Sequence, residues 1–270
     1  MNVTFVTPYP LSYGSIRHMG GEPIRALTKS GKYNATLGNC HTKSNAVMFV
    51  HLKKPCYNLL HTHKHAKHIF QTIDGFDKYE GFSYAITNNP SQPCMAQRFC
   101  VSIPHNFNGL GCGCTATSDM KLPLPTRPIL FIPGVRRDSD RSFPLLEQHM
   151  QIYFEKEPCP CKMYNRAHVT LAWRRHIDSP YKPLERFTNG LSLGRFTIGD
   201  EYYQGLRYLD QQYKDFVCSD EKCILAKIIK FNSSHHYRNE FKSFSARVLS
   251  KINNLTHEYD NLFERVLRER

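Results

Sequence analysis

The residues best suited to binding a charged substrate lie in the segment 167–201. A strand is predicted to end at Arg174, and a helix over 183–194 is predicted to begin directly after Lys182. Lys182 and, one turn further on, Arg186 would join the unpaired backbone N–H groups at the positive end of that helix. Such a site would bind an anion, for instance a diphosphate. On spacing alone, the simpler interpretation is an amphipathic surface helix with solvated charges.

The elements that must position these residues are short strands that alternate with helices. Strands are expected at 2–7, 35–40, 45–52, 68–74, 82–89, 98–106, 127–137, 167–175 and 195–200. Helices are expected at 22–33, 61–67, 142–156, 183–194 and 201–216. Ser142 would cap the third of these helices. The alternation is typical of α/β domains built on parallel sheets.

Two domains and a helical tail are expected. Residues 108–127 are rich in Gly, Pro, Ser and Thr, which favours a linker. The expected divisions are a first domain at 1–107, a linker at 108–126, a second domain at 127–218 and C-terminal helices at 219–270. From Phe241 to Val266, apolar residues recur at three- and four-residue steps, as in an amphipathic helix. Ligands of parallel α/β sheets bind beyond the carboxyl ends of the strands, so we expect a site in a cleft between the two domains.

The segment 167–201 resembles the nucleotide-sugar-binding half of GT-B-type glycosyltransferases, one branch of which carries the pattern R…KP…KL.NA…G.P.I…E. The matching residues are Arg174 or Arg175, Lys182-Pro183, Arg186-Phe187, Asn189-Gly190, Gly194, Ile198 and Glu201. MNVTFVTPYP with MGGEPIRALTKSGKY resembles the first strand, glycine loop and first helix of that fold, and RPILFIPGVRR resembles the start of its second domain. The resemblance touches most of residues 1–205.

The resemblance implies two Rossmann-like domains that face a cleft, and it implies roles for single residues. The residues implied to bind the donor are Arg136, Arg137, Arg174, Lys182, Arg186, Asn189 and Glu201. Lys182 and Arg186 would bind the donor phosphates. Arg136 or Arg137 would help to neutralise the leaving diphosphate. Asn189 and Glu201 would contact sugar or ribose hydroxyls. A structural role is an equal alternative for each of them.

An inverting reaction would also need a general base that accepts a proton from the acceptor hydroxyl. His18 lies in the first strand–helix loop, Asp74 ends the strand at 68–74, and His105 lies in the sequence IPHN. All three are near predicted strand ends, which makes them the candidate bases. Each has a structural alternative, since Asp74, for example, would also suit a turn with the glycine that follows it.

Two glycines and one departure from the family pattern bear on the reaction. Gly20 and Gly21 would let the backbone approach the diphosphate or the acceptor closely. The retaining branch usually carries two glutamates eight residues apart, but Tyr181 and Asn189 occupy those positions here. Retention of configuration is therefore not implied.

The resemblance implies a glycosyltransferase of the hexosyltransferase type that moves a sugar from a nucleotide-diphosphate donor to a glycan or lipid-linked acceptor. No cofactor and no obligatory metal are expected, because Lys and Arg can stabilise the charge of the leaving group. Two alternatives stay open. One is a non-catalytic binding protein on a degenerate glycosyltransferase scaffold, and the other is a basic nucleic-acid-binding protein.

Composition limits the classes of protein and of partner. The chain has 270 residues, of which 40% are hydrophobic and 12% aromatic, so disordered and collagen-like chains are excluded. The net charge of +13 favours anionic partners, among which nucleic acid is not the expected one. No apolar stretch reaches the roughly 18 residues of a membrane span, and the first residues lack the basic start of a signal peptide. We expect a cytoplasmic protein with peripheral contact to an anionic membrane.

Cysteine and histidine spacing does not favour a metal site. The ten cysteines are expected to stay mostly reduced in the cytoplasm. Pairs such as Cys112 and Cys114 have one-residue spacers, which fit structural zinc poorly. The histidines between 61 and 68 alternate with Lys64 and Lys67, whose charges oppose a cation. A basic surface patch is the favoured interpretation, and no metal is expected.

Overall fold

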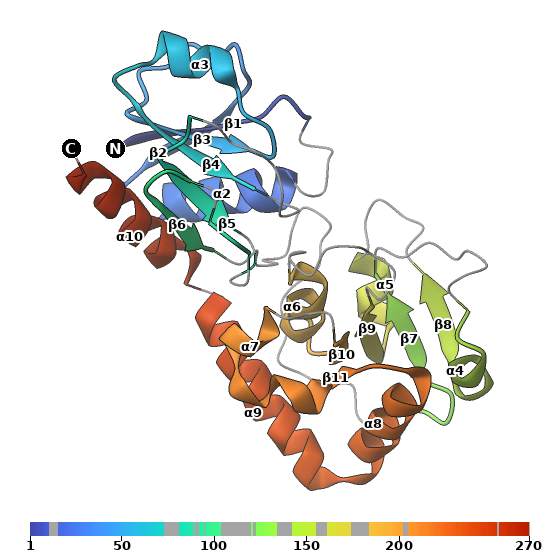
Figure 1. Ribbon diagram of the computed structural model, residues 1–270. Helices are drawn as coiled ribbons and strands as arrows, with labels where there is room; N and C mark the ends of the chain where they lie inside the picture. Colours follow the sequence, from blue (N-terminus) through green and yellow to red (C-terminus); the bar gives the residue numbers. More distant parts are fainter. Residues whose placement is uncertain are drawn as a thin grey trace. The chain divides into compact units, whose positions relative to one another are not determined.

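A computed structural model provides the architecture (Figure 1). It describes residues 1–10, 16–72, 81–87, 89, 92–94, 96–103, 120, 123–133, 142–154, 161–173, 184–201, 205–252 and 254–269, without the side chains of Arg17, His18, Cys161 and Leu255. The chain forms two compact units, each built on its own parallel sheet. The first unit contains Met1–Asn106 and Ile252–Arg270, and the second contains Phe107–Pro180 and Leu184–Lys251. The fold is therefore α/β with a helical C-terminal part, as predicted.

The first sheet has six strands in the order β2-β1-β3-β4-β5-β6, and all its described pairings are parallel. The strands are β1 (Asn2–Val6), β2 (Asn34–Gly38), β3 (Met48–Leu52), β4 (Lys67–Gln71), β5 (Tyr84–Thr87) and β6 (Phe99–Ser102). Every residue of β3 is buried. Burial on both faces explains why every residue of this strand except His51 is apolar.

Helices cover both faces of the first sheet. The helices at the start of this unit are the π-helical turn η1 (Arg17–Gly21), α2 (Glu22–Lys29) and α3 (Tyr57–Thr62). Met48 and Val50 share a core cluster with Leu27 of α2, whereas Phe49 between them packs with Leu59 of α3. Because side chains alternate along a strand, α2 and α3 lie on opposite faces.

The last helix, α10 (Leu255–Arg268), packs beside α2 in the first unit (Figure 1). Tyr259 and Phe263 are fully buried in the same cluster as Phe5. The ring of Tyr259 meets that of Phe5 edge-on with centroids 5.8 Å apart, and its hydroxyl donates to Oε1 of Gln71 at 3.2 Å. A helix from the end of the sequence therefore completes the core of the first unit.

The second sheet has five strands in the order β11-β10-β9-β7-β8, and its described pairings are also all parallel. The strands are β7 (Ile129–Ile132), β8 (Gln151–Phe154), β9 (Val169–Ala172), β10 (Phe196–Asp200) and β11 (Val217–Cys218). The helices are α4 (Pro144–His149), α5 (Cys161–Arg166), α6 (Glu185–Ser192), α7 (Leu206–Leu209), η2 (Gln211–Phe216), α8 (Glu221–Ser233) and α9 (His235–Ile252).

An aromatic cluster joins α8 and α9 to the second sheet. Phe196 of β10 stacks on Phe231 of α8 with centroids 3.9 Å apart, and Phe241 of α9 meets it edge-on at 4.9 Å. Arg247 of α9 donates to both carboxylate oxygens of Asp210, at 2.6 and 3.2 Å. These bonds hold the pKa of Asp210 below its usual value. The two long helices are thus fixed to the second unit by ring packing and one bidentate ion pair.

Three expectations about local structure need correction. The helix expected at 142–156 is the single turn of α4 followed by β8, and Phe143, not Ser142, is the N-cap residue. The strand expected to run to residue 74 ends at Gln71. The helix expected at 201–216 is broken into α7 and the 3-10 turn η2, with Asp210 between them in an extended conformation. The first and third errors merged two short elements into one longer pattern.

The expectation that the cysteines stay mostly reduced is wrong for six of the ten. The described residues form the disulfides Cys40–Cys56, Cys94–Cys100 and Cys218–Cys223. Disulfides persist in oxidising surroundings and are rare in the reducing cytosol.

Buried His51 of β3 and half-buried His68 of β4 form a chain of hydrogen bonds in the first sheet. The backbone N–H of Cys56 donates to Nδ1 of His51, so the remaining proton of neutral His51 is on Nε2. Nε2 of His51 is 3.0 Å from Nδ1 of His68, and Nε2 of His68 is 3.0 Å from the carbonyl oxygen of His63. The chain is complete only when both rings are neutral. Burial and the neighbouring His68 lower the pKa of His51 to about 3, and burial also lowers the pKa of His68.

Replacing Tyr259 by Ala should destabilise the first unit by about 3–5 kcal/mol, since it empties the space of a buried aromatic ring. Urea denaturation, followed by a probe in the first unit, measures the change. Leu267→Ala is the matched control because Leu267 lies on the same helix and is 47% exposed. A Tyr259→Ala effect as small as that of the control would show that α10 is not part of the core.

The free energy of unfolding should fall as the pH drops below about 6.5. His51 and His68 then bind protons in the unfolded chain but stay neutral in the folded protein. The contribution is complete above pH 6.5 and is lost towards the folded pKa of His51, about 3. The slope is at most about 1.4 kcal/mol per pH unit for each proton. Denaturation at several pH values should give a shallower slope for His51→Gln than for the exposed-site control His61→Gln. Equal slopes would contradict the histidine chain.

Candidate functional site

The candidate site is built on the crossover β9–α6–β10 of the second unit. Strands β9 and β10 pair in parallel, from Val169 opposite Phe196 to Ala172 opposite Gly199. The helix α6 connects them, so it begins at the edge of the sheet where β9 ends. Its first turn therefore presents free backbone N–H groups at the carboxyl edge of the second sheet.

A glycine lets α6 approach the sheet closely. The hydroxyls of Thr170 and Thr197 on the two strands lie 2.9 Å apart under the helix. A Cβ atom at Gly190 would come within 2.3 Å of both hydroxyl oxygens. Phe187 and Leu191, on the same side of α6, are buried as well. Only glycine allows this contact, which fixes the height and the rotation of the helix on the sheet.

The opposite side of α6 carries polar atoms that are buried and have no hydrogen-bond partner. They are Nη1 of Arg186, Oδ1 of Asn189 and Oγ of Ser192. Steps of three residues place these side chains on one side of the helix. Asn189 and Ser192 are 6% and 5% exposed. A buried polar atom without a partner costs free energy, and three on one helix face are the pattern expected when a polar ligand supplies the missing bonds.

Strand β10 brings two carboxyl groups to the same edge. Asp200, its last residue, is 1% exposed, whereas Glu201, which follows it, is exposed. The N–H of Glu201 donates to the carbonyl oxygen of Cys218 at 3.1 Å, and Cys218 is linked to Cys223 at the start of α8. The disulfide and the short strand β11 thus hold the backbone that carries both carboxyl groups.

Two of the predicted donor-binding residues lie at this edge, Arg186 in the first turn of α6 and Glu201 after β10. A third, Asn189, lies one turn further along α6. Four others lie outside the described residues, namely Arg136, Arg137, Arg174 and Lys182. The candidate bases Asp74 and His105 also lie outside them, and His18 is described only as backbone within η1.

The two glycines predicted to approach a substrate lie in η1. A Cβ atom at Gly20 would come within 2.8 Å of Cδ1 of Leu52, so the close approach seen at Gly20 is to the core of the first unit. Around Gly21 a Cβ atom would meet nothing within 4 Å. Packing alone accounts for Gly20, and the substrate role of both glycines stays a prediction.

Sequence reasoning missed Ser192 and Asp200. Ser192 lies three residues after Asn189, and that spacing becomes informative only once the helix has been oriented on the sheet. Asp200 ends the predicted strand RFTIGD, so its position at a strand end could have identified it. The family pattern points instead to its exposed neighbour, Glu201.

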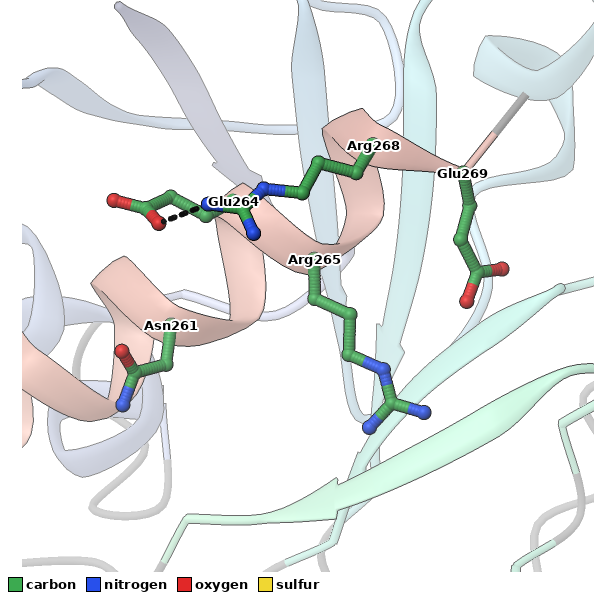
Figure 2. Close-up of a pocket in the computed structure, with 5 residues that line it drawn as sticks. All are labelled: Asn261, Glu264, Arg265, Arg268 and Glu269. Atoms are coloured by element: carbon green, nitrogen blue, oxygen red, sulfur yellow. Dashed lines mark hydrogen bonds and ion pairs between the residues drawn. The ribbon is translucent and has the colours of Figure 1, made fainter.

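A hollow on the outer side of α10 is a charged helix surface (Figure 2). It is lined by Asn261, Glu264, Arg265, Arg268 and Glu269. Arg268 donates to Glu264 at 3.2 Å, and the guanidinium of Arg265 lies 3.7 Å from the ring centroid of Phe99. Its charges are paired or stacked within the protein, so it is not a second candidate site.

The described part of the chain contains neither a metal-binding cluster nor a helix that could span a membrane. No group of at least three His, Cys, Asp and Glu residues there is arranged to hold a metal ion. Of the histidines between 61 and 68, His68 is engaged with His51 and with the carbonyl oxygen of His63. Among the described helices, none is both long enough and apolar enough to cross a bilayer.

Comparison with known proteins identifies the fold. No family model and no curated protein matches the sequence. A glycosyltransferase from Rickettsia africae ESF-5 superposes with a TM-score of 0.67 at 9% identity, over 100% of this chain and 99% of that one. T4 phage β-glucosyltransferase in complex with UDP-glucose gives 0.62 at 8% identity, over 99% and 100% of the two chains. A β-glucosyltransferase described as a DNA-modifying enzyme gives 0.61 at 10% identity, over 98% and 99%.

The chain has the GT-B fold along its whole length. Its two parallel sheets and C-terminal helices superpose on these glycosyltransferases over 98–100% of the chain. The identities of 8–10% show likeness of fold alone. The fold expected from the segment 167–201 is confirmed.

Replacing Gly190 by Ala should destabilise the second unit by about 1–3 kcal/mol, because the new methyl group would overlap Thr170 and Thr197 and lift α6 from the sheet. The effect opposes the helix propensity of alanine, which alone would stabilise the helix by about 1 kcal/mol. Gly21→Ala is the control, since that position has helical dihedral angles and open space around it. Thermal and urea denaturation measure the change in stability. If Gly190→Ala were as stable as wild type, the close approach of α6 to the sheet would be contradicted.

Proposed function

We propose that this protein is a glycosyltransferase that transfers a sugar from a nucleoside diphosphate donor and binds that donor at α6. The fold supports the reaction class, since glycosyltransferases with UDP-glucose as substrate share it. The proposal about the site rests on one observation, the three unpartnered buried polar atoms on a single side of α6. Two of the three side chains, Arg186 and Asn189, are those that the family pattern implies to contact the donor.

Charge stabilisation is the part of the reaction that these residues can perform. When the bond between the sugar and the diphosphate breaks, negative charge develops on the leaving diphosphate. The N–H groups in the first turn of α6 and the guanidinium of Arg186 supply positive potential at that edge. Asn189 and Ser192 would bind sugar or ribose hydroxyls. Because a cationic side chain can stabilise the leaving group, we propose that no metal is obligatory.

The acceptor side of the reaction belongs to the first unit in this proposal. A general base there would accept the proton of the acceptor hydroxyl as the new glycosidic bond forms. His18, Asp74 and His105 are the proposed candidates for that role. The proposed acceptor is a glycan or a lipid-linked glycan.

One specific observation keeps a second candidate open. The net charge of +13 suits a nucleic acid as acceptor, and one structure of the same fold is a DNA-modifying β-glucosyltransferase. Transfer of glucose to duplex DNA, tested with radiolabelled UDP-glucose, would distinguish the two acceptor classes.

Donor binding should depend on α6. Thermal-shift titration with UDP, GDP, ADP and CMP, with and without EDTA, identifies the base, because a ligand that binds only the folded state raises the melting temperature. We expect one nucleoside diphosphate to raise it without metal. Arg186→Gln and Asn189→Ala should each weaken binding by about tenfold or more, corresponding to the loss of a hydrogen bond to a charged ligand.

Arg207→Gln is the matched control, because it removes one positive charge from an exposed position of the same unit. Equal affinities in Arg186→Gln and in this control would contradict the donor site. Absence of any shift at millimolar nucleotide would contradict an active transferase. Binding of a nucleotide sugar without hydrolysis or transfer would favour the non-catalytic alternative.

A further inference from the structure

A second hollow lies at the carboxyl edge of the first sheet. It has a volume of about 410 Å³ and is lined by Thr7, Tyr9, Pro10, Leu37, Gly38, Asn39 and Thr42. These residues follow or end β1 and β2, neighbouring parallel strands. Leu37 is 36% exposed and Tyr9 is half-buried, so the hollow has an apolar patch with polar groups around it. Small-molecule sites combine these features at this edge of α/β sheets.

The wall of the hollow formed after β2 is a tightly bonded turn. The N–H of Asn39 donates to Oγ1 of Thr42 at 2.7 Å, and the N–H of His41 donates to Oδ1 of Asn39 at 2.8 Å. A Cβ atom at Gly38 would come within 2.4 Å of Oγ1 of Thr42, so glycine is needed for the turn to close. The N–H of Thr7 donates to the carbonyl oxygen of Gly38 and links this turn to the end of β1. The wall is therefore rigid before any ligand binds.

A strained turn after β3 directs two lysines to the same place. The N–H of Lys54 donates to the carbonyl oxygen of Leu52 at 2.7 Å, and Lys53 between them has φ of +66°. This is a γ-turn with positive φ, which is rare and costly for a residue with a side chain. Among the described residues other than glycine, Lys53 alone has positive φ. Strain of this kind persists only where the surrounding structure enforces it, and it is concentrated at binding sites.

The strained turn places two positive charges beside Tyr9. The Nζ atoms of Lys53 and Lys54 lie 5.1 and 5.8 Å from the centroid of the Tyr9 ring. Tyr9 also lines the hollow, so both ammonium groups lie close to one of its lining side chains. An anionic group held between such lysines would lie next to a ring bound against Tyr9 and Leu37.

Two covalent and hydrogen-bonded braces hold the lysine turn against the wall. The disulfide Cys40–Cys56 joins the turn after β2 to the segment that follows Lys53 and Lys54. The N–H of Cys56 donates to Nδ1 of the buried His51, which continues the histidine chain to β4. The lysine turn is therefore fixed relative to the turn after β2, which forms one wall of the hollow.

We propose that this hollow binds the acceptor and that the acceptor is a phosphorylated sugar, with its ring against Tyr9 and Leu37 and its phosphate at Lys53 and Lys54. The inference rests on the proposed glycosyltransferase function and names the substrate class for its acceptor side. The volume of about 410 Å³ is large enough for one sugar ring and one phosphate. A nucleic acid strand would instead need a basic groove that follows several phosphates.

Isothermal titration calorimetry without any donor tests the proposal with glucose and glucose 6-phosphate as probes. We expect glucose 6-phosphate to bind at least tenfold more tightly than glucose and to weaken as salt increases, since the lysines contribute through charge. Lys53→Gln and Lys54→Gln should each raise its dissociation constant about tenfold. Lys64→Gln, which removes an exposed lysine charge from the same unit, should leave it within about twofold.

The outcomes separate this inference from the donor site. Equal binding of glucose and glucose 6-phosphate, or equal effects of Lys53→Gln and Lys64→Gln, would overturn it. A single-stranded oligonucleotide that depends on Lys53 for binding, together with no binding of glucose 6-phosphate, would also overturn it. UDP is titrated into the same variants. If Lys53→Gln binds UDP as wild type does but no longer binds glucose 6-phosphate, the inference is supported. If the wild-type protein does not bind UDP, the proposed function alone is contradicted.

Discussion

Parallel strand pairing is the constraint on which the rest of this structure depends. Every described pair in both sheets is parallel, so each strand must be followed by a crossover and all strands of a sheet end at one edge. The segments that follow strands are therefore collected there. In the second unit they bring together α6 and Asp200, and in the first they bring together Tyr9, the turn after Gly38 and Lys53. Both candidate sites are consequences of the same rule of sheet geometry.

Local contacts then fix the segments that follow the strands. Gly190 lets α6 rest on two threonine hydroxyls, and this contact determines that Arg186, Asn189 and Ser192 lie on the other side of the helix. In the first unit, a disulfide and the histidine chain hold a lysine turn whose backbone would otherwise relax. Buried polar atoms without partners and strained backbone both cost stability. Their position at strand ends indicates binding, because proteins rarely retain such costs elsewhere.

The sequence predicts much of the fold for a clear physical reason. Strand β3 is buried on both faces and is apolar apart from His51. The family pattern over 167–201 predicted the fold, which the comparisons confirm, and it also predicts donor contacts for Arg186 and Asn189. The edge strand β8 was missed because its residues are only partly buried and directly follow a one-turn helix. The turn at Lys53 contains no glycine or asparagine, so the sequence does not predict its positive φ. Disulfide pairing depends on how close the Cα atoms of two cysteines lie in the folded chain, which composition cannot show.

The central claim is that α6 holds the diphosphate end of a nucleotide donor. A crystal structure of the protein with UDP tests it most directly. The account predicts UDP oxygens within about 3 Å of Nη1 of Arg186 and a hydrogen-bond partner on Oδ1 of Asn189, so that the buried atoms are no longer unpaired. UDP bound elsewhere, with both of those atoms still without a partner, would contradict the account.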